Sequence, residues 1–341
     1  MTPGRIGGPG PHPAGGDSLS RPFSILALDG GGIRGIFSAA VLAFFEEDLG
    51  IRIPDHFDLI VGTSTGAIIA LGLGAGMRPA EIVELYAHRK DEIFPPARRR
   101  APGKARSLLR SKYRPDGLEA ALRTAFGDRL LCESGVPLVI PSFDLGRRGV
   151  HVFKTPHHER LRRDWRVSMV DVALAASAAP TFFPAHTLPD EHVRLIDGGV
   201  WANNPSTVAV TEAVSLFGQP LDNIKLLNIG TITSNAVRAR HLDTGGLFSW
   251  IRSPNVVDVL MAGQAVGAFN QAAHLVGTHN AFRLDVFAPD YLVRLDDADP
   301  RELIAAAAAD SRHFSPTFGK HFARHTRHAY RPHKTREDLN A

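Results

Sequence analysis

The chain has 341 residues, of which 44% are hydrophobic and 22% charged, with a single cysteine and a formal net charge of +4. This composition excludes wholesale disorder, and one cysteine excludes an internal disulfide framework and a cysteine-rich zinc site. Residues 98–114 carry eight Lys or Arg and residues 312–336 carry seven, in both cases without an acid. Such blocks indicate an anionic surface or ligand, or else two solvated segments.

Residues 1–20 are mainly Gly, Pro and polar residues, so we expect a flexible leader and no signal peptide. Together with the single cysteine, this favours a cytoplasmic protein. The apolar residues 23–28 then predict the first buried strand.

That strand leads into the sequence Asp29-Gly-Gly-Gly-Ile-Arg-Gly35, after which apolar residues recur at helical spacing. Successive glycines can direct several backbone N–H groups to one point, and the helix N-terminus behind them adds positive potential. We therefore expect Gly30, Gly31 and Gly32 to hold either a phosphate or a developing oxyanion.

Gly30, Gly32 and Gly35 also fit the dinucleotide-binding fingerprint G-x-G-x-x-G, which requires an acid about 20 residues further on, at the end of the next strand. Asp55 has this spacing but precedes the next strand, which we expect at 57–61. That strand ends instead at Gly62-Thr-Ser64-Thr-Gly66, the G-x-S-x-G pattern of a nucleophile elbow. An oxyanion hole that serves Ser64 accounts for both glycine motifs.

A nucleophilic serine needs a base. Asp197-Gly198-Gly199 places a carboxylate at the end of a further apolar strand, at 193–196. An aspartate has an ordinary pKa of about 3.9, so it can act as a base only when hydrogen-bonded to the serine in a sheltered site. Two alternatives remain open from the residues alone: a simple Asx turn, or a Ser-His-Asp triad that uses one of the three histidines His241, His274 and His279.

The alternation of strands and helices predicts an α/β fold with a mostly parallel sheet covered by helices on both faces. The further predicted strands are 137–140, 151–154 and 224–229, and the further predicted helices are 79–94, one from 117, 168–179, 205–217, 255–276 and 300–313. We expect one domain at 21–315, with its core motifs in 23–230 and a helical extension at 250–315. A basic tail rich in histidine, at 316–341, is expected to lack a fixed structure.

The motifs Asp29–Gly35, Gly62–Gly66 and Asp197–Gly199, together with ASAAPTFFP at 176–184 and DGGVWANNP at 197–205, closely resemble those of patatin-like phospholipases. The resemblance spans about residues 23–230. It implies a three-layer α/β/α fold and hydrolysis of acyl esters of phospholipids by a Ser-Asp dyad, without histidine, metal or cofactor.

The resemblance also implies roles for individual residues. Ser64 is the expected nucleophile, Asp197 the expected base, and the N–H groups of Gly30, Gly31 and Gly32 the expected oxyanion hole. Arg34 is expected to brace the glycine loop. The supporting glycines of the same motifs are Gly35, Gly62, Gly66, Gly198 and Gly199.

Within the family, these segments are most similar to plant patatins and to bacterial CapV-type effectors of anti-phage CBASS defence, which a cyclic dinucleotide activates. The resemblance therefore implies two partners: a phospholipid membrane surface bound peripherally and a cyclic dinucleotide activator. A further expected partner is a second copy of the chain, since the predicted helix 255–276 could either pack within the domain or form a self-association surface. No nucleic acid is expected. The alternatives are a constitutive lipid acyl hydrolase or esterase without nucleotide control, a His-triad hydrolase, and a nucleotide-binding module without turnover.

Overall fold

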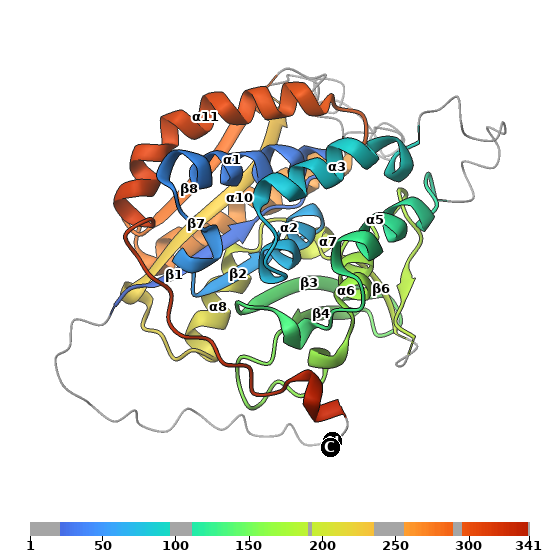
Figure 1. Ribbon diagram of the computed structural model, residues 1–341, viewed down its shortest axis with the longest axis horizontal. Helices are drawn as coiled ribbons and strands as arrows, with labels where there is room; N and C mark the ends of the chain where they lie inside the picture. The colour runs from blue at the N-terminus through green and yellow to red at the C-terminus, as the bar shows by residue number, and fades with distance from the viewer. Residues whose placement is uncertain (1–20, 96–110, 190–192, 235–255, 289–294, 340–341) are drawn as a thin grey trace.

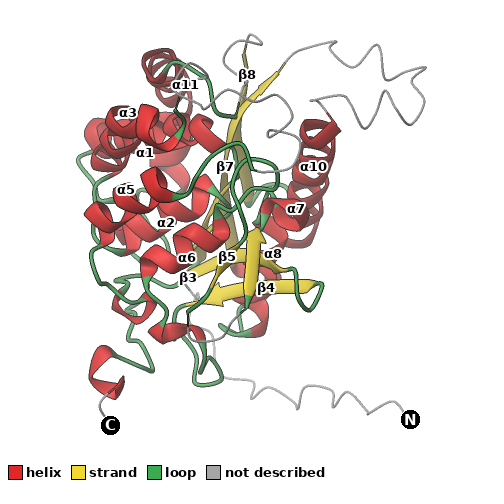
Figure 2. Ribbon diagram, turned by 90° about the vertical axis from the view of Figure 1, so that its right-hand side faces the viewer, coloured by secondary structure: helices red, strands yellow, loops and turns green. Residues whose placement is uncertain are grey.

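The structure, a computed structural model, describes residues 21–339 except for 96–110, 190–192, 235–255 and 289–294. The predicted leader at 1–20 and most of the basic block at 98–114 therefore lie outside the described residues. Figure 1 shows helices in front of a central sheet, and the view turned by 90° in Figure 2 shows further helices on its other face. The predicted α/β class and three-layer arrangement are confirmed.

The sheet has eight strands in the order β5-β6-β3-β2-β1-β7-β8, with β4 paired to β3. The pairs among β1, β2, β3, β7 and β8 are parallel, whereas β4, β5 and β6 join by antiparallel pairs. The strands are β1 (Phe23–Leu28), β2 (Leu59–Gly62), β3 (Leu138–Asp144), β4 (Gly149–Lys154), β5 (His186–Thr187), β6 (Arg194–Asp197), β7 (Ile224–Ser234) and β8 (Ala281–Ala288). β5 and β8 are strands that the sequence analysis did not predict.

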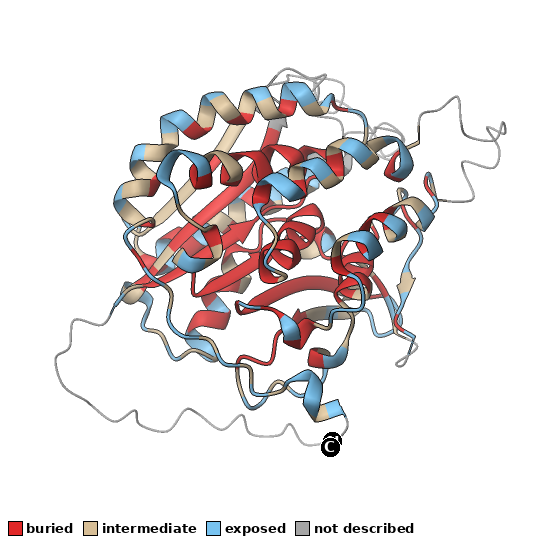
Figure 3. Ribbon diagram, in the orientation of Figure 1, coloured by how far each residue is buried: buried red, intermediate tan, exposed pale blue. Residues whose placement is uncertain are grey.

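Alternate residues of the central strands face opposite helical layers, as the pleat requires. On β1, Leu26 and Leu28 belong to a large core with one layer of helices, whereas Ile25 and Ala27 belong to a smaller core with the other. The first layer consists of α1 (Gly35–Leu49), α2 (Thr65–Gly74), α3 (Pro79–Ile93), α5 (Asp116–Phe126), α6 (Met169–Ala176) and α11 (Pro300–His321). The second consists of α7 (Gly199–Ala202), α8 (Ser206–Ser215) and α10 (Val256–Val276). Figure 3 shows the inner strands buried on both faces.

The C-terminal region differs from the expectation. The predicted helix 300–313 continues through Pro316 to His321, and the residues after it are described to 339. Phe318 and Phe322, one helical turn apart, are fully buried and stack on Phe45 and Phe57 of the core. The expectation of a tail without fixed structure is therefore wrong, because apolar and polar contacts hold it along the side of the molecule (Figure 1).

Candidate active site

Ser64 lies at the tight turn between β2 and α2, where the backbones of the strand and the helix approach each other closely. Its φ of 55° and ψ of −120° are in a region that residues other than glycine rarely adopt. A Cβ atom on Gly62 would lie 2.1 Å from the carbonyl oxygen of Gly66, and one on Gly66 would lie 2.4 Å from that of Leu28. The two glycines of the motif therefore let strand and helix pass each other at this turn.

Asp197 is the last residue of β6 and meets Ser64 from 133 positions further along the chain. Ser64 Oγ donates a hydrogen bond of 2.5 Å to Asp197 Oδ2, and the N–H of Gly199 donates one of 2.7 Å to Asp197 Oδ1. Both side chains are buried, and burial raises the pKa of Asp197 to about 6 although the two hydrogen bonds lower it. Gly198 packs against the backbone of Pro141 on β3, which fixes the turn after the carboxylate.

The glycine loop lies beside the two residues, but its three N–H groups are not equivalent. The N–H of Gly30 donates to the carbonyl oxygen of Asn203 at 3.0 Å and is therefore already used. Gly31 and Gly32 line the cavity next to Ser64, and within the described part of the chain their N–H groups have no acceptor. Of the three N–H groups expected to form an oxyanion hole, only those of Gly31 and Gly32 are thus available beside the cavity.

Several contacts hold this loop in place. Arg34 Nε donates to the carbonyl oxygen of Gly31 at 3.1 Å, and its Nη1 donates to that of Ile232 at 2.9 Å. Thr65 Oγ1 donates to the carbonyl oxygen of Gly32 at 2.7 Å, and Gly35 packs against the Thr65 side chain. The loop is therefore braced both by its own arginine and by the residue after Ser64.

A buried polar network, which the sequence analysis missed, lies under the start of the loop. Asp29 accepts hydrogen bonds from Arg283 Nη1 at 2.9 Å and from Asn228 Nδ2 at 2.7 Å. Asn204 Nδ2 donates to Asn228 Oδ1 at 3.0 Å, which joins the network to the segment after Asp197. Burial raises the pKa of Asp29 to about 6, against the opposing effect of the Arg283 guanidinium.

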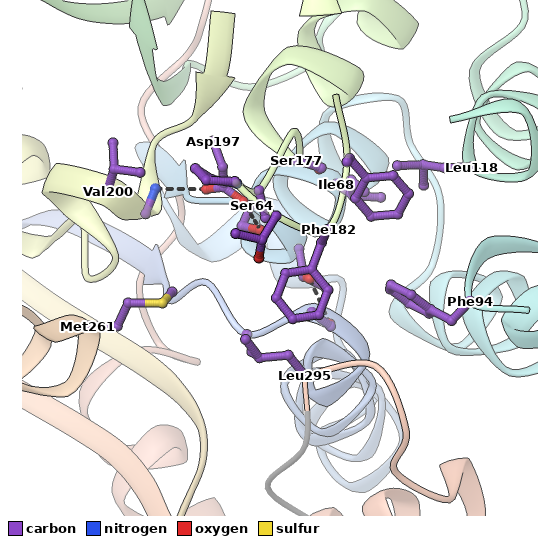
Figure 4. Close-up of a pocket in the computed structure, with 18 of the residues that line it drawn as sticks. Ser64, Ile68, Phe94, Leu118, Ser177, Phe182, Asp197, Val200, Met261 and Leu295 are labelled. Carbon is purple, nitrogen blue, oxygen red and sulfur yellow. Dashed lines mark hydrogen bonds between the residues drawn. The ribbon is translucent and has the colours of Figure 1, made fainter. Parts of the chain in front are cut away.

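Ser64 and Asp197 line a cavity of about 300 Å³ that is otherwise mainly apolar (Figure 4). Its walls come from both helical layers and from the segment 177–183, which belongs to the ASAAPTFFP motif. The larger apolar side chains that line it are Ile68, Phe94, Leu118, Phe182, Phe183, Val200, Leu260, Met261 and Leu295. A cavity of this kind fits a hydrocarbon chain next to a polar reacting group.

The histidines proposed for a triad do not meet Ser64 in the described structure. His274 lies near the end of α10 and His279 follows that helix, and no histidine of the described residues lines the cavity. His241 lies outside the described residues. The two oxygens of Asp197 are instead used by Ser64 and by the Gly199 backbone.

Comparisons with known proteins agree with the motifs. The family model described as patatin-like phospholipase matches residues 26–210. The chain is 34% identical to a cGAMP-activated phospholipase of Vibrio cholerae, over 65% of this chain and 68% of that protein. It is 30% identical to a cGAMP-activated phospholipase of Escherichia coli, over 84% and 83%, and 31% identical to patatin-like protein 2 of Arabidopsis thaliana, over 73% and 69%.

Proposed function

The chain belongs to the patatin-like phospholipase family, and we propose that it is a serine lipid acyl hydrolase in which Ser64 is the nucleophile and Asp197 the base. The observation that carries this proposal is the 2.5 Å hydrogen bond from Ser64 Oγ to Asp197 Oδ2 at the wall of an apolar cavity. It joins the hydroxyl that must lose a proton to the carboxylate that can take it.

In the first half of the reaction, Ser64 Oγ attacks the ester carbonyl carbon while its proton moves to Asp197. The carbonyl electron pair moves to the oxygen, and the N–H groups of Gly31 and Gly32 stabilise the resulting charge. When the ester C–O bond breaks, the proton held by Asp197 passes to the leaving alcohol and the acyl group stays on Ser64.

In the second half, water attacks the acyl group and gives a proton to Asp197. Collapse of this second intermediate returns the proton to Ser64 Oγ and releases the fatty acid. Asp197 thus alternates between base and acid, which is favourable for a carboxyl group whose pKa of about 6 lies nearer neutrality than that of an exposed aspartate.

The surface beside the cavity supports a membrane as the source of substrate. Val200 on α7 and Leu260 on α10 line the cavity, and their exposed fractions are 49% and 66%. Val266 lies two helical turns after Val259 on α10 and is 56% exposed. Residues 259–273 of that helix carry no charged side chain. Exposed apolar side chains beside an acyl-chain cavity are suited to contact with the hydrocarbon surface of a bilayer.

Two described aromatic residues, one before the basic block and one near its end, lie at or beside the same cavity. Phe94, which precedes it, lines the cavity, and Tyr113, near its end, lies 5.5 Å from Phe94 and 5.7 Å from Phe183 between ring centroids. A Lys or Arg near an acidic membrane adds about 1 kcal/mol of attraction to its anionic headgroups, and we propose this role for the basic block. Among the described residues, no helix combines the length and apolar character that crossing a bilayer requires.

The relatives named cGAMP-activated phospholipase support control of this activity by a cyclic dinucleotide. A direct assay distinguishes control by a cyclic dinucleotide from a hydrolase that is active without nucleotide. We expect hydrolysis of phospholipid vesicles to be slow without nucleotide and to rise when cGAMP is added. Equal rates with and without a panel of cyclic dinucleotides would favour the constitutive hydrolase.

The dyad is tested with Ser64→Ala, Asp197→Ala and the double variant. Each single change should remove nearly all hydrolysis of a short soluble ester, and the double variant should be no worse than either, because the two residues act as one unit. Circular dichroism checks that the fold persists. Near-normal turnover by Asp197→Ala would contradict the assignment of Asp197 as the base and would favour a histidine in that role.

A further inference from the structure

The C-terminal tail returns to the sheet at the end of β2 that is opposite to Ser64. Asp58 immediately precedes β2 and is buried, and two tail histidines meet its carboxylate. His325 Nε2 lies 2.8 Å from Asp58 Oδ2, and His328 Nδ1 lies 2.7 Å from Asp58 Oδ1. These three side chains form the Asp58 cluster, and its three ligand-type atoms all lie within 4.8 Å of one another.

The cluster is fixed from two independent parts of the fold. The backbone N–H groups of Ser24 and His328 donate to the two oxygens of Asp58 at 2.7 and 2.5 Å, which set the orientation of the carboxylate. His325 is buried after the aromatic end of α11, whereas the side chain of His328 is 47% exposed and its ring stacks on Phe23. The buried carboxylate and imidazole are therefore held firmly, and the exposed imidazole leaves a path from solvent.

From this geometry we propose that the Asp58 cluster binds a zinc ion through Asp58, His325 Nε2 and His328 Nδ1. Two imidazole nitrogens and one carboxylate oxygen are a donor set that zinc prefers, and water can complete a tetrahedron. The ion takes the place of the imidazole protons that point at the carboxylate, and the backbone N–H groups remain as outer partners that orient it.

Such a site is structural and separate from the hydrolase chemistry. Asp58 and Ser64 lie at opposite ends of β2, so the ion does not touch the reacting groups. Its effect is to fasten the tail to the sheet. Two residues that are distant in sequence, 58 and 325, would then be joined by a metal bridge in a chain that has one cysteine and no internal disulfide.

The test uses the full chain after removal of metal by a chelator, reloading with zinc and gel filtration. The wild-type protein should keep one zinc ion per chain, measured by mass spectrometry of the metal. His328→Ala and Asp58→Asn should bind zinc at least about 10-fold more weakly, since even loss of an outer partner costs this much. His333→Ala is the matched control, because it removes another exposed tail histidine outside the cluster and should bind zinc as the wild type does.

A second readout does not depend on hydrolysis. Zinc should raise the Tm of the wild type and of His333→Ala by more than that of His328→Ala at the same zinc concentration, since only the first two retain all three ligands. Equal zinc retention by His328→Ala and the wild type would overturn the proposal. So would a wild-type protein that retains no zinc, in which case the cluster is a hydrogen-bonded latch alone.

Discussion

Asp197, the proposed base, is a carboxylate in a role that an imidazole fills in many serine hydrolases. A solvent-exposed aspartate would be a poor base for a serine hydroxyl, because its proton affinity is too low at neutral pH. Two features of this site make Asp197 a better base. Burial raises its pKa to about 6, and the hydrogen bond from Ser64 Oγ already places the proton next to the carboxylate. Gly199 holds the other oxygen, so the carboxylate cannot turn away.

The raised pKa predicts the pH dependence of the reaction. Because Asp197 must be ionised to accept the proton, kcat/KM for a soluble ester should rise with pH through about 6 and level off above it. Asp29 also has a pKa of about 6, so Asp29→Asn is the control. Its kcat/KM should be lower at every pH but should still rise through about pH 6. If this rise is lost in Asp29→Asn, the group that titrates is Asp29 and not Asp197.

At the scale of elements, the turn between β2 and α2 places backbone strain at Ser64, the proposed nucleophile. The positive φ of Ser64 costs of order 1–3 kcal/mol for a residue other than glycine. The neighbouring glycines and the packed strands β1 and β2 must offset this cost. Strain of this kind is expected where function, and not stability, selects the conformation.

The strain predicts an order of stability for two inactive variants. Ser64→Gly and Ser64→Ala both lose the hydroxyl and its bond to Asp197, but only glycine adopts this backbone without penalty. Ser64→Gly should therefore have the higher Tm by differential scanning calorimetry. A higher Tm for Ser64→Ala would mean that the turn is not strained.

A substitution in the glycine loop separates the effect of displaced N–H groups on kcat from an effect on stability. The backbone of Gly31 is extended, which any residue adopts, but an added Cβ would meet Thr231 Cγ2 at 2.5 Å and Oγ1 at 2.7 Å. Gly31→Ala should thus displace the N–H groups and lower kcat by about 10²–10³, with a small change in Tm. Thr231 Cβ would lie at 2.8 Å as well, so adding Thr231→Gly removes all three atoms and should restore part of kcat, whereas no recovery would indicate that the loss does not come from this displacement of the loop.

The elements also show where sequence reasoning succeeds and fails. Ser64 and Asp197 could be predicted because each is part of a short motif that requires a particular turn. Arg283 could not, because its role depends on a strand, β8, whose apolar run is interrupted by two charges: Arg283, which pairs with Asp29, and Asp285, which pairs with Arg283. The extension of α11 beyond the predicted 300–313 to His321 does not follow from the sequence pattern, because Pro316 is a typical helix breaker, whereas burial of Phe318 and Phe322 favours the longer helix.

At the scale of the whole molecule, the chemistry and the proposed membrane contact share one side. The carboxyl ends of β1 and β2 bring the glycine loop and the elbow together, and α7 and α10 lie side by side next to them (Figure 2). The tail crosses to the opposite end of the sheet, where it contacts Asp58. The arrangement leaves the cavity mouth bordered by exposed apolar side chains, while the C-terminal residues are held away from it.

This separation allows the membrane contact to be tested without disturbing the reaction. Val266→Asp places a charge on the exposed apolar face of α10 without altering a residue that lines the cavity. It should weaken binding to phospholipid vesicles and slow hydrolysis there, because burial of a carboxylate in the bilayer surface is costly, while turnover of a short soluble ester stays the same. The matched control is Leu275→Asp, at an exposed position about 14 Å further along the same helix, which should leave both activities unchanged. If Val266→Asp slows both substrates equally, the face supports the fold or binds another copy of the chain, and the bilayer must approach the cavity from elsewhere.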